Sequence, residues 1–104
     1  FYAKTPVLDK ERVSQVKEVV SIPLVLHGAS GLSDEDIREC VERGMCKVNF
    51  ATELRAAYTD AGKKLLAEKP ETFDPKKLGV VGMEAVKELV KNRMKVCGCD
   101  HKAV

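Results

Sequence analysis

Two short apolar segments, each followed by a small polar loop and then by a helix-like segment, most constrain how this chain can fold. Residues 22–26 form a continuous apolar run rather than an alternating one, which is typical of a strand buried on both faces of a parallel sheet. Pro23 stands near its start, where the missing N–H is tolerated. Residues 46–50 form a second candidate strand. The sequence therefore indicates a parallel α/β architecture.

Helical patterns surround both strands. We expect helices over residues 9–20, 33–44, 52–70 and 80–96, with a surface loop over residues 71–78. Asp9 and Ser33 are the expected N-caps, Asp36 completes a capping-box variant, and Gly44 ends the second helix. The expected buried stripes of the first two helices are formed by Val13, Val16, Val19, Val20, Ile37, Cys40 and Val41.

Composition limits the class of protein. With 104 residues and 44% hydrophobic residues, the chain has the composition of one small soluble domain and not of a disordered or collagen-like segment. A net charge of +2 from interspersed basic and acidic residues is too weak to indicate a nucleic-acid partner. No apolar run approaches the roughly 20 residues of a membrane span. Since no secretory signal is visible, we expect a cytoplasmic protein with four reduced cysteines.

The chain is too short for the parallel sheet that its pattern predicts. Two strands are too few for a stable parallel sheet, because each leaves an open edge. The first residue is Phe1 rather than methionine. We therefore expect residues 1–104 to form a single partial domain that belongs to something longer.

The loops that follow the two strands carry the chemistry. Residues 27–31 read His-Gly-Ala-Ser-Gly, where glycines let the backbone approach a ligand and successive N–H groups can cradle an anion. Residues 49–52 read Asn-Phe-Ala-Thr and lead into a helix N-terminus, where the helix dipole favours phosphate. The pattern predicts a phosphate site shared by the two loops. The alternative is ordinary turn glycines with Thr52 as a helix N-cap.

Two further motifs leave alternatives open. His27, at the end of a strand, is either a hydrogen-bonded structural residue or a ligand. Cys97, Cys99 and His101 have a spacing that can bind a soft metal, but a structural zinc site needs four ligands. We favour a partly packed helix end for this segment.

The combination of the two loop motifs resembles one family. Residues 22–32, Ile-Pro-Leu-Val-Leu-His-Gly-Ala-Ser-Gly-Leu, followed by Lys-Val-Asn-Phe-Ala-Thr-Glu-Leu at 47–54, are similar to the C-terminal part of class II, zinc-dependent ketose-bisphosphate aldolases. The tagatose-1,6-bisphosphate aldolase branch is the most similar. The resemblance implies the last two βα units plus the C-terminal helices of a TIM (β/α)8 barrel.

The resemblance also implies a role for each matching residue. His27 matches one of the zinc-binding histidines, and Gly28, Ala29 and Ser30 match the first dihydroxyacetone-phosphate loop. The second loop is matched by Asn49, Phe50, Ala51 and Thr52, with Phe50 in place of the more usual valine, and Asn49 is further expected to contact the substrate carbons and the enediolate.

The function that the resemblance implies is reversible cleavage of tagatose 1,6-bisphosphate into dihydroxyacetone phosphate and glyceraldehyde 3-phosphate. The family's fructose branch tends to carry aspartate in the second loop where this chain has Ala51 and Glu53, which favours tagatose. The alternatives are a fructose-1,6-bisphosphate aldolase of the same class and a non-catalytic phosphosugar-binding or assembly fragment. The implied cofactor is Zn²⁺, with room for a monovalent cation near the phosphate, and the implied assembly is a homodimer or homotetramer.

The family's other zinc ligands and its proton-transferring aspartate have no match in this chain. We therefore expect the 104-residue chain alone to be inactive. Arg93 or a lysine near Lys76 is the candidate for the distal phosphate.

Overall fold

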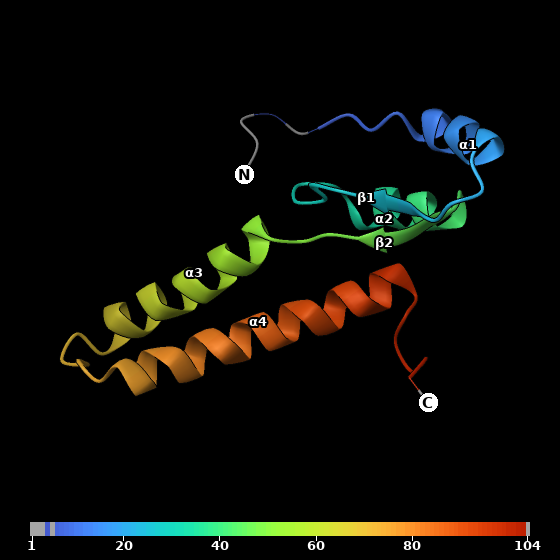
Figure 1. The fold of residues 1–104 in the computed structure, drawn as a ribbon. Helices are drawn as coiled ribbons and strands as arrows, with labels where there is room; N and C mark the ends of the chain where they lie inside the picture. Colours follow the sequence, from blue (N-terminus) through green and yellow to red (C-terminus); the bar gives the residue numbers. More distant parts are fainter. Residues whose placement is uncertain (1–3, 5, 104) are drawn as a thin grey trace.

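The computed structural model describes residue 4 and residues 6–103, and in this part of the chain six elements follow one another along an elongated molecule (Figure 1). They alternate between helix and strand in the first half and end in two long helices. The elements are α1 (Lys10–Val19), β1 (Leu24–Leu26), α2 (Asp34–Glu42), β2 (Met45–Val48), α3 (Thr52–Glu68) and α4 (Pro75–Cys97).

The two strands pair in parallel, as the sequence predicts. Leu24 pairs with Met45 and Leu26 with Val48, with an irregularity in register after Leu24. Helix α2 makes the crossover connection between the strands. Because parallel strands end at the same edge of a sheet, this pairing brings the two polar loops together.

The predicted caps of the first two helices are present. Asp9 accepts a hydrogen bond from the Arg12 N–H at 3.1 Å, and Ser33 Oγ accepts one from the Asp36 N–H at 3.1 Å. Gly44 follows α2 with a φ of 121°, a conformation that favours glycine and ends the helix.

The N-terminus of α4 corrects the sequence prediction. The segment 71–78 is not wholly a loop, because α4 begins at Pro75. Asp74 accepts a hydrogen bond from the Lys76 N–H at 2.9 Å and so acts as the N-cap. Proline is favourable in a first helical turn, where its missing N–H has no intrahelical acceptor and its fixed φ suits the helix. Pro75 therefore starts the helix that the sequence placed five residues later.

The core is small and centred on α2. Ile37 and Cys40 are completely buried, as their helical spacing predicts. In α1 only Val13 is buried, whereas Val19 is 80% exposed. In β1, Val25 is 40% exposed, so the expected burial of this strand on both faces is wrong for the described residues. The sheet of the described residues has two strands, and no further strand in this part of the chain covers these side chains.

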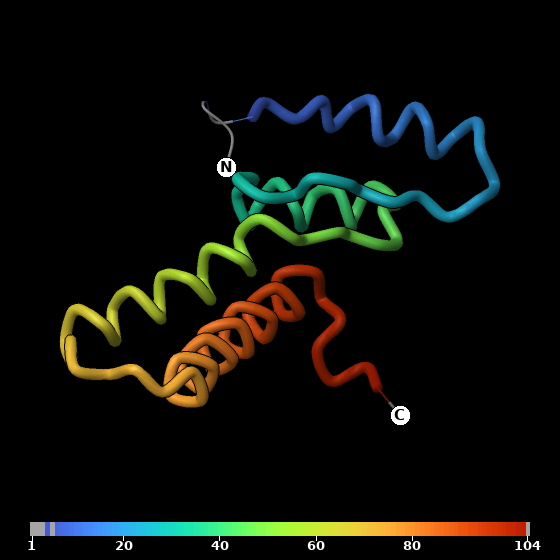
Figure 2. The backbone as a smooth tube through the Cα atoms, turned by 60° about the vertical axis from the view of Figure 1, so that its left-hand side comes forward, coloured from blue at the N-terminus to red at the C-terminus, as the bar shows by residue number. Residues whose placement is uncertain are grey.

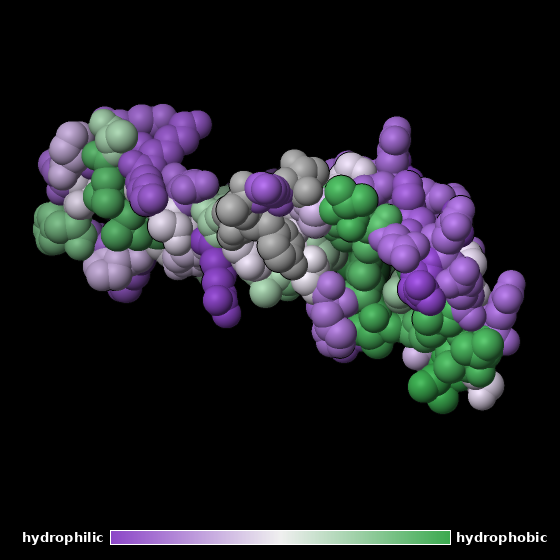
Figure 3. All heavy atoms as spheres, turned by 90° about the horizontal axis from the view of Figure 1, so that it is seen from above, coloured by the Kyte–Doolittle hydropathy of each residue, from purple (hydrophilic) through white to green (hydrophobic). Residues whose placement is uncertain are grey.

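Helices α3 and α4 form a hairpin that extends away from the sheet (Figures 1 and 2). The molecule measures 58 × 39 × 19 Å, and its radius of gyration is 17.2 Å, against about 13 Å for a compact domain of this length. Apolar side chains are visible both at the hairpin end and at the sheet end of the molecule (Figure 3). No helix among the described residues has the length and hydrophobicity to span a bilayer.

Candidate functional site

The two loops predicted to bind phosphate lie side by side beyond the carboxyl ends of β1 and β2. The Asn49 N–H donates to the Leu26 carbonyl at 2.9 Å, and the Ala29 N–H donates to the Asn49 carbonyl at 3.4 Å. The hydrogen-bond ladder of the sheet thus continues past both strands. It fixes residues 27–31 against residues 49–52, the two segments that the sequence analysis paired.

His27 and Asn49 contact each other directly within this site. The side-chain amide of Asn49 lies 2.9 Å from His27 Nδ1. The atom at this distance is the amide nitrogen Nδ2, whose N–H donates, so Nδ1 accepts this bond and its lone pair is engaged. The contact holds the His27 ring in one orientation beside Asn49. The contact joins a predicted metal ligand to a predicted substrate contact, a link that the sequence did not reveal.

The first loop presents backbone donors. Gly28 and Gly31 have φ values of 67° and 88°, which non-glycine residues rarely adopt. Ala29 and Ser30 are buried, at 1% and 6% exposure. Within the described residues, neither the Ser30 N–H, the Ser30 hydroxyl nor the Gly31 N–H finds an acceptor or donor. Unused donors next to buried backbone are typical of an anion-binding loop.

The second loop ends at an uncapped helix. Ala51 occupies the N-cap position of α3, and no side chain caps this end. Thr52 is the first helical residue, so the alternative that Thr52 is the N-cap is wrong. The N–H groups of Thr52 and Glu53 have no acceptor among the described residues. An uncapped helix N-terminus carries partial positive charge from these groups and from the helix dipole.

Arg93 contacts the second loop and the first turn of α3. Its guanidinium donates to both carboxylate oxygens of Glu53, at 3.0 Å and 2.7 Å, and to Asp34 at 2.8 Å. The same group lies 5.5 Å from the centre of the Phe50 ring. Burial alone lowers the pKa of Arg93, but the hydrogen bonds and charges of Glu53 and Asp34 outweigh it and raise the pKa. Because two carboxylates neutralise the charge of the Arg93 guanidinium, a positioning role is favoured over a contact with the phosphate.

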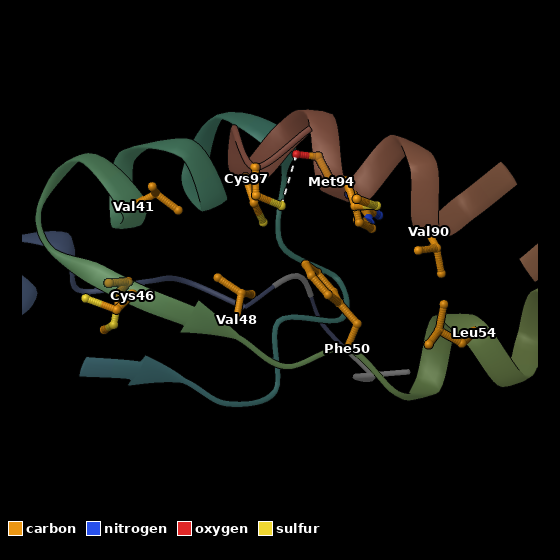
Figure 4. A pocket seen from close by; sticks show the side chains of 11 residues that line it. Val41, Cys46, Val48, Phe50, Leu54, Val90, Met94 and Cys97 are labelled. Carbon is orange, nitrogen blue, oxygen red and sulfur yellow. Dashed lines mark hydrogen bonds between the residues drawn. The ribbon is translucent and has the colours of Figure 1, made fainter. Parts of the chain in front are cut away.

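Phe50 differs from its neighbours in the second loop. Its side chain lines a cavity of about 300 Å³ between β2 and α4, together with Val48, Leu54 and Val90 (Figure 4). The ring therefore faces the cavity next to α4, and the backbone of Phe50 remains for a ligand of the loops. Lys76, the other candidate for a distal phosphate, lies in the first turn of α4 at the far end of the hairpin (Figure 1).

His27 is the candidate zinc ligand among the described residues. Catalytic zinc takes three protein ligands. No three histidine, cysteine, aspartate or glutamate side chains in the described segments lie close enough together to hold a metal ion. This includes Cys97, Cys99 and His101, so the spacing of these residues does not produce a metal site. His27, whose Nδ1 contacts Asn49, is a candidate for one ligand of such a site.

The parallel strands, the crossover helix and the polar loops at the strand ends define an α/β protein whose site lies where α/β enzymes bind their ligands. The model of the family "Fructose-bisphosphate aldolase class-II" matches residues 1–102. The chain belongs to this aldolase family.

Solved structures of aldolases have the same fold. The YdjI aldolase from Escherichia coli K12 is 39% identical, with a TM-score of 0.83 over 95% of this chain and 37% of that chain. A putative fructose-1,6-bisphosphate aldolase from Coccidioides immitis is 31% identical, with a TM-score of 0.78 over 92% of this chain and 36% of that chain. The chain thus spans little more than a third of the length of these proteins.

A more distant structure supports the fold alone. Fructose-bisphosphate aldolase from Campylobacter jejuni is 20% identical, with a TM-score of 0.76 over 95% of this chain and 36% of that chain. The long helical hairpin and the two-stranded ladder are therefore retained across wide sequence divergence.

Proposed function

We propose that this chain is the C-terminal part of a class II aldolase and holds the phosphate of the dihydroxyacetone-phosphate half of a ketose 1,6-bisphosphate. One observation carries the proposal: the unused donors of Ser30 and Gly31 lie on a loop tied to the uncapped N-terminus of α3. Two sets of backbone donors and a hydroxyl then face one anion. Hydrogen bonds from such groups to a charged oxygen contribute about 1.5–3 kcal/mol each.

The residues of the chain perform positioning in this reaction. Donors from Ser30 and Gly31 in the first loop and from Thr52 and Glu53 after the second loop fix the phosphate and hence the attached three-carbon unit. Holding the reacting carbons in one geometry removes much of the entropic barrier to bond cleavage. In this proposal Asn49, which contacts His27, also contacts the substrate carbons.

His27 supplies one ligand for Zn²⁺ in this proposal. When bound, zinc acts as a Lewis acid that polarises the substrate ketone. Asn49 holds the His27 ring in one orientation at 2.9 Å, and this contact supports the assignment. The remaining zinc ligands and the group that moves the proton come from the rest of the protein, so the isolated chain has no turnover.

We propose tagatose 1,6-bisphosphate as the substrate, with fructose 1,6-bisphosphate as the second candidate. Ala51 supports tagatose, because the fructose branch tends to carry an aspartate there. The description of the family and the name of the Coccidioides immitis protein refer to fructose bisphosphate and support the second candidate. Cleavage rates of the complete protein on both sugars, measured side by side, decide between them.

The phosphate site is tested on the chain itself by titration with inorganic phosphate. We expect amide shifts in the NMR spectrum at Ser30, Gly31, Thr52 and Glu53, and a 10- to 100-fold weaker affinity in Ser30→Ala, the effect of about 1.5–3 kcal/mol. Thr59→Val, at an exposed position on α3, is the matched control. Shifts scattered over surface lysines, or equal affinity in Ser30→Ala and the parent chain, would refute the site.

Cleavage activity of the complete protein distinguishes the aldolase from the non-catalytic alternative. We expect cleavage activity that is lost on chelation of zinc and in His27→Ala, with the zinc content of this variant reduced. Full zinc occupancy in His27→Ala contradicts the ligand role. A complete protein that binds phosphate without cleaving either sugar supports the non-catalytic alternative.

A further inference from the structure

The C-terminus of α4 carries two cysteines on either side of one glycine. Gly98 has a φ of 75°, and its N–H donates to the Lys95 carbonyl at 3.1 Å. The Cys99 N–H donates to the Met94 carbonyl at 3.0 Å. These two bonds form a Schellman turn, which reverses the chain and holds Cys97 and Cys99 beside the same helix end.

Both thiols border the cavity between β2 and α4 (Figure 4). Cys99 is exposed, and its Sγ donates to the Met94 carbonyl at 3.5 Å, whereas Cys97 is half-buried. Burial raises the pKa of the Cys97 thiol, and the charge of a Cys99 thiolate raises it further. Of the two thiols, that of Cys99 is therefore the one open to solvent.

The backbone allows these two thiols to join. Residues two apart are separated by at most about 7 Å between Cα atoms, and the turn at Gly98 shortens that span. A disulfide needs a Cα separation of about 4.4–6.8 Å. The small ring closed across one glycine leaves strain in the bond, and strained, exposed disulfides are readily reduced. The geometry therefore suits a reversible bond rather than a permanent one.

We propose that Cys97 and Cys99 form a redox-active pair that exchanges with small disulfides. The Cys99 thiolate attacks one sulfur of glutathione disulfide, which forms a mixed disulfide and releases one glutathione thiolate. Cys97 then loses its proton to solvent and attacks the Cys99 sulfur, which forms the Cys97–Cys99 bond and releases the second glutathione. The protein dithiol is oxidised, and one glutathione disulfide is reduced to two glutathione molecules.

The other two cysteines lack this arrangement. Cys40 is completely buried, and burial raises the pKa of its thiol, which makes it inert. Cys46 is exposed but donates to the Gly44 carbonyl at 3.6 Å, on the strand side of the cavity. The pair at the end of α4 is therefore distinguished by its turn and by its accessibility.

The test uses the sequence around the pair. Trypsin cleavage after Lys95 and Lys102 releases residues 96–102, a peptide that contains Cys97 and Cys99 and no other cysteine. The folded chain is equilibrated with mixtures of glutathione and its disulfide, quenched with an alkylating reagent and analysed by mass spectrometry. As the fraction of glutathione disulfide rises, we expect this peptide to escape alkylation and to be lighter than its dithiol form by two hydrogen atoms. Reduction should restore the alkylated peptide.

Two variants identify the bond. Cys99→Ser prevents the intramolecular disulfide and leaves at most a glutathione adduct on Cys97, whereas Cys46→Ser leaves the oxidised peptide unchanged. The proposal is overturned if residues 96–102 carry only alkylated or glutathione-bound cysteines at the highest disulfide fraction. A bond from Cys46 to either cysteine, detected as a cross-linked peptide and lost in Cys46→Ser, overturns it equally.

Discussion

Arg93 and Glu53, which are 40 residues apart in the sequence, form a two-pronged ion pair that ties α4 to the first turn of α3. Both side chains are largely buried, at 17% and 12% exposure. Because Glu53 directly follows the loop 49–52, this pair sets where the second candidate phosphate loop lies relative to the helical hairpin.

Replacement of Arg93 by glutamine should destabilise the chain by about 2 kcal/mol, because it leaves the Glu53 carboxylate poorly solvated and without its charged partner. Urea unfolding measures the loss. Arg38→Gln, at an exposed position on α2, is the control and should change stability by less than about 0.5 kcal/mol. Equal stabilities of the two variants contradict the role of Arg93.

Gly82→Ala should weaken the packing of α3 against α4. A Cβ atom at Gly82 lies 2.5 Å from the Tyr58 ring, so the ring or the helix has to move. Overpacking of this kind costs about 1–3 kcal/mol and exceeds the gain of about 1 kcal/mol from better helix propensity.

Gly79→Ala is the matched control for this prediction, since its Cβ lies at an ordinary 3.7 Å from the Tyr58 hydroxyl. We expect this variant to be as stable as the parent chain or more stable, by thermal unfolding. A Gly82→Ala variant that is more stable than the parent chain would contradict the expected clash with the Tyr58 ring.

The ion cluster between α1 and α2 should make stability depend on pH in acid. The hydrogen bond from Lys10, at 2.7 Å, and then that from Arg43 lower the pKa of Glu39. The unfolded chain therefore binds a proton at Glu39 before the folded chain does, and stability falls as the pH drops below the ordinary carboxylate range. The hydrogen bond from Lys10 to Glu39 and then that to Asp36 raise the pKa of Lys10, so its contribution persists until strongly alkaline pH.

Lys10→Gln should reduce this acid dependence without removing it, because Arg43 still contacts Glu39 at 3.1 Å. Urea unfolding from pH 7 down to acid measures the difference in unfolding free energy between Lys10→Gln and the parent chain. This difference should narrow toward low pH. Lys91→Gln, which removes an exposed pair with Glu88, serves as the control. A constant difference between Lys10→Gln and the parent chain at every acidic pH would argue against the linkage.

Asn49→Ala should weaken zinc binding by the complete protein about 10- to 100-fold, as expected when the residue that orients a ligating histidine is removed. Competition with a chromophoric chelator gives the affinity. Asn92→Ala, at an exposed position on α4, should leave it unchanged. An unaltered zinc affinity in Asn49→Ala would mean that the His27–Asn49 contact does not contribute to metal binding.

Much of the local structure could be predicted from the sequence because its signals are local. Asp9, Ser33 and Gly44 act within one helical turn, and the spacing of Ile37 and Cys40 identifies the buried face of α2. The start of α4 at Pro75 differs from the prediction because proline is compatible with both a loop and a first helical turn, and the Asp74 cap decides between them. The starts of the other three helices and the positions of both strands lie within a few residues of the predicted ones.

The order of helices and strands, the two loop motifs and the resemblance to class II aldolases could be predicted from the amino-acid sequence, since each depends on residues close together in the chain. The contact of His27 with Asn49 and the engagement of Arg93 by Glu53 and Asp34 became known from the folded structure alone. The folded structure also shows that Val19 and Val25 stay exposed despite an apolar pattern. The physical reason is that burial and charge pairing depend on which distant segments pack together, and periodicity records only which face of an element is apolar.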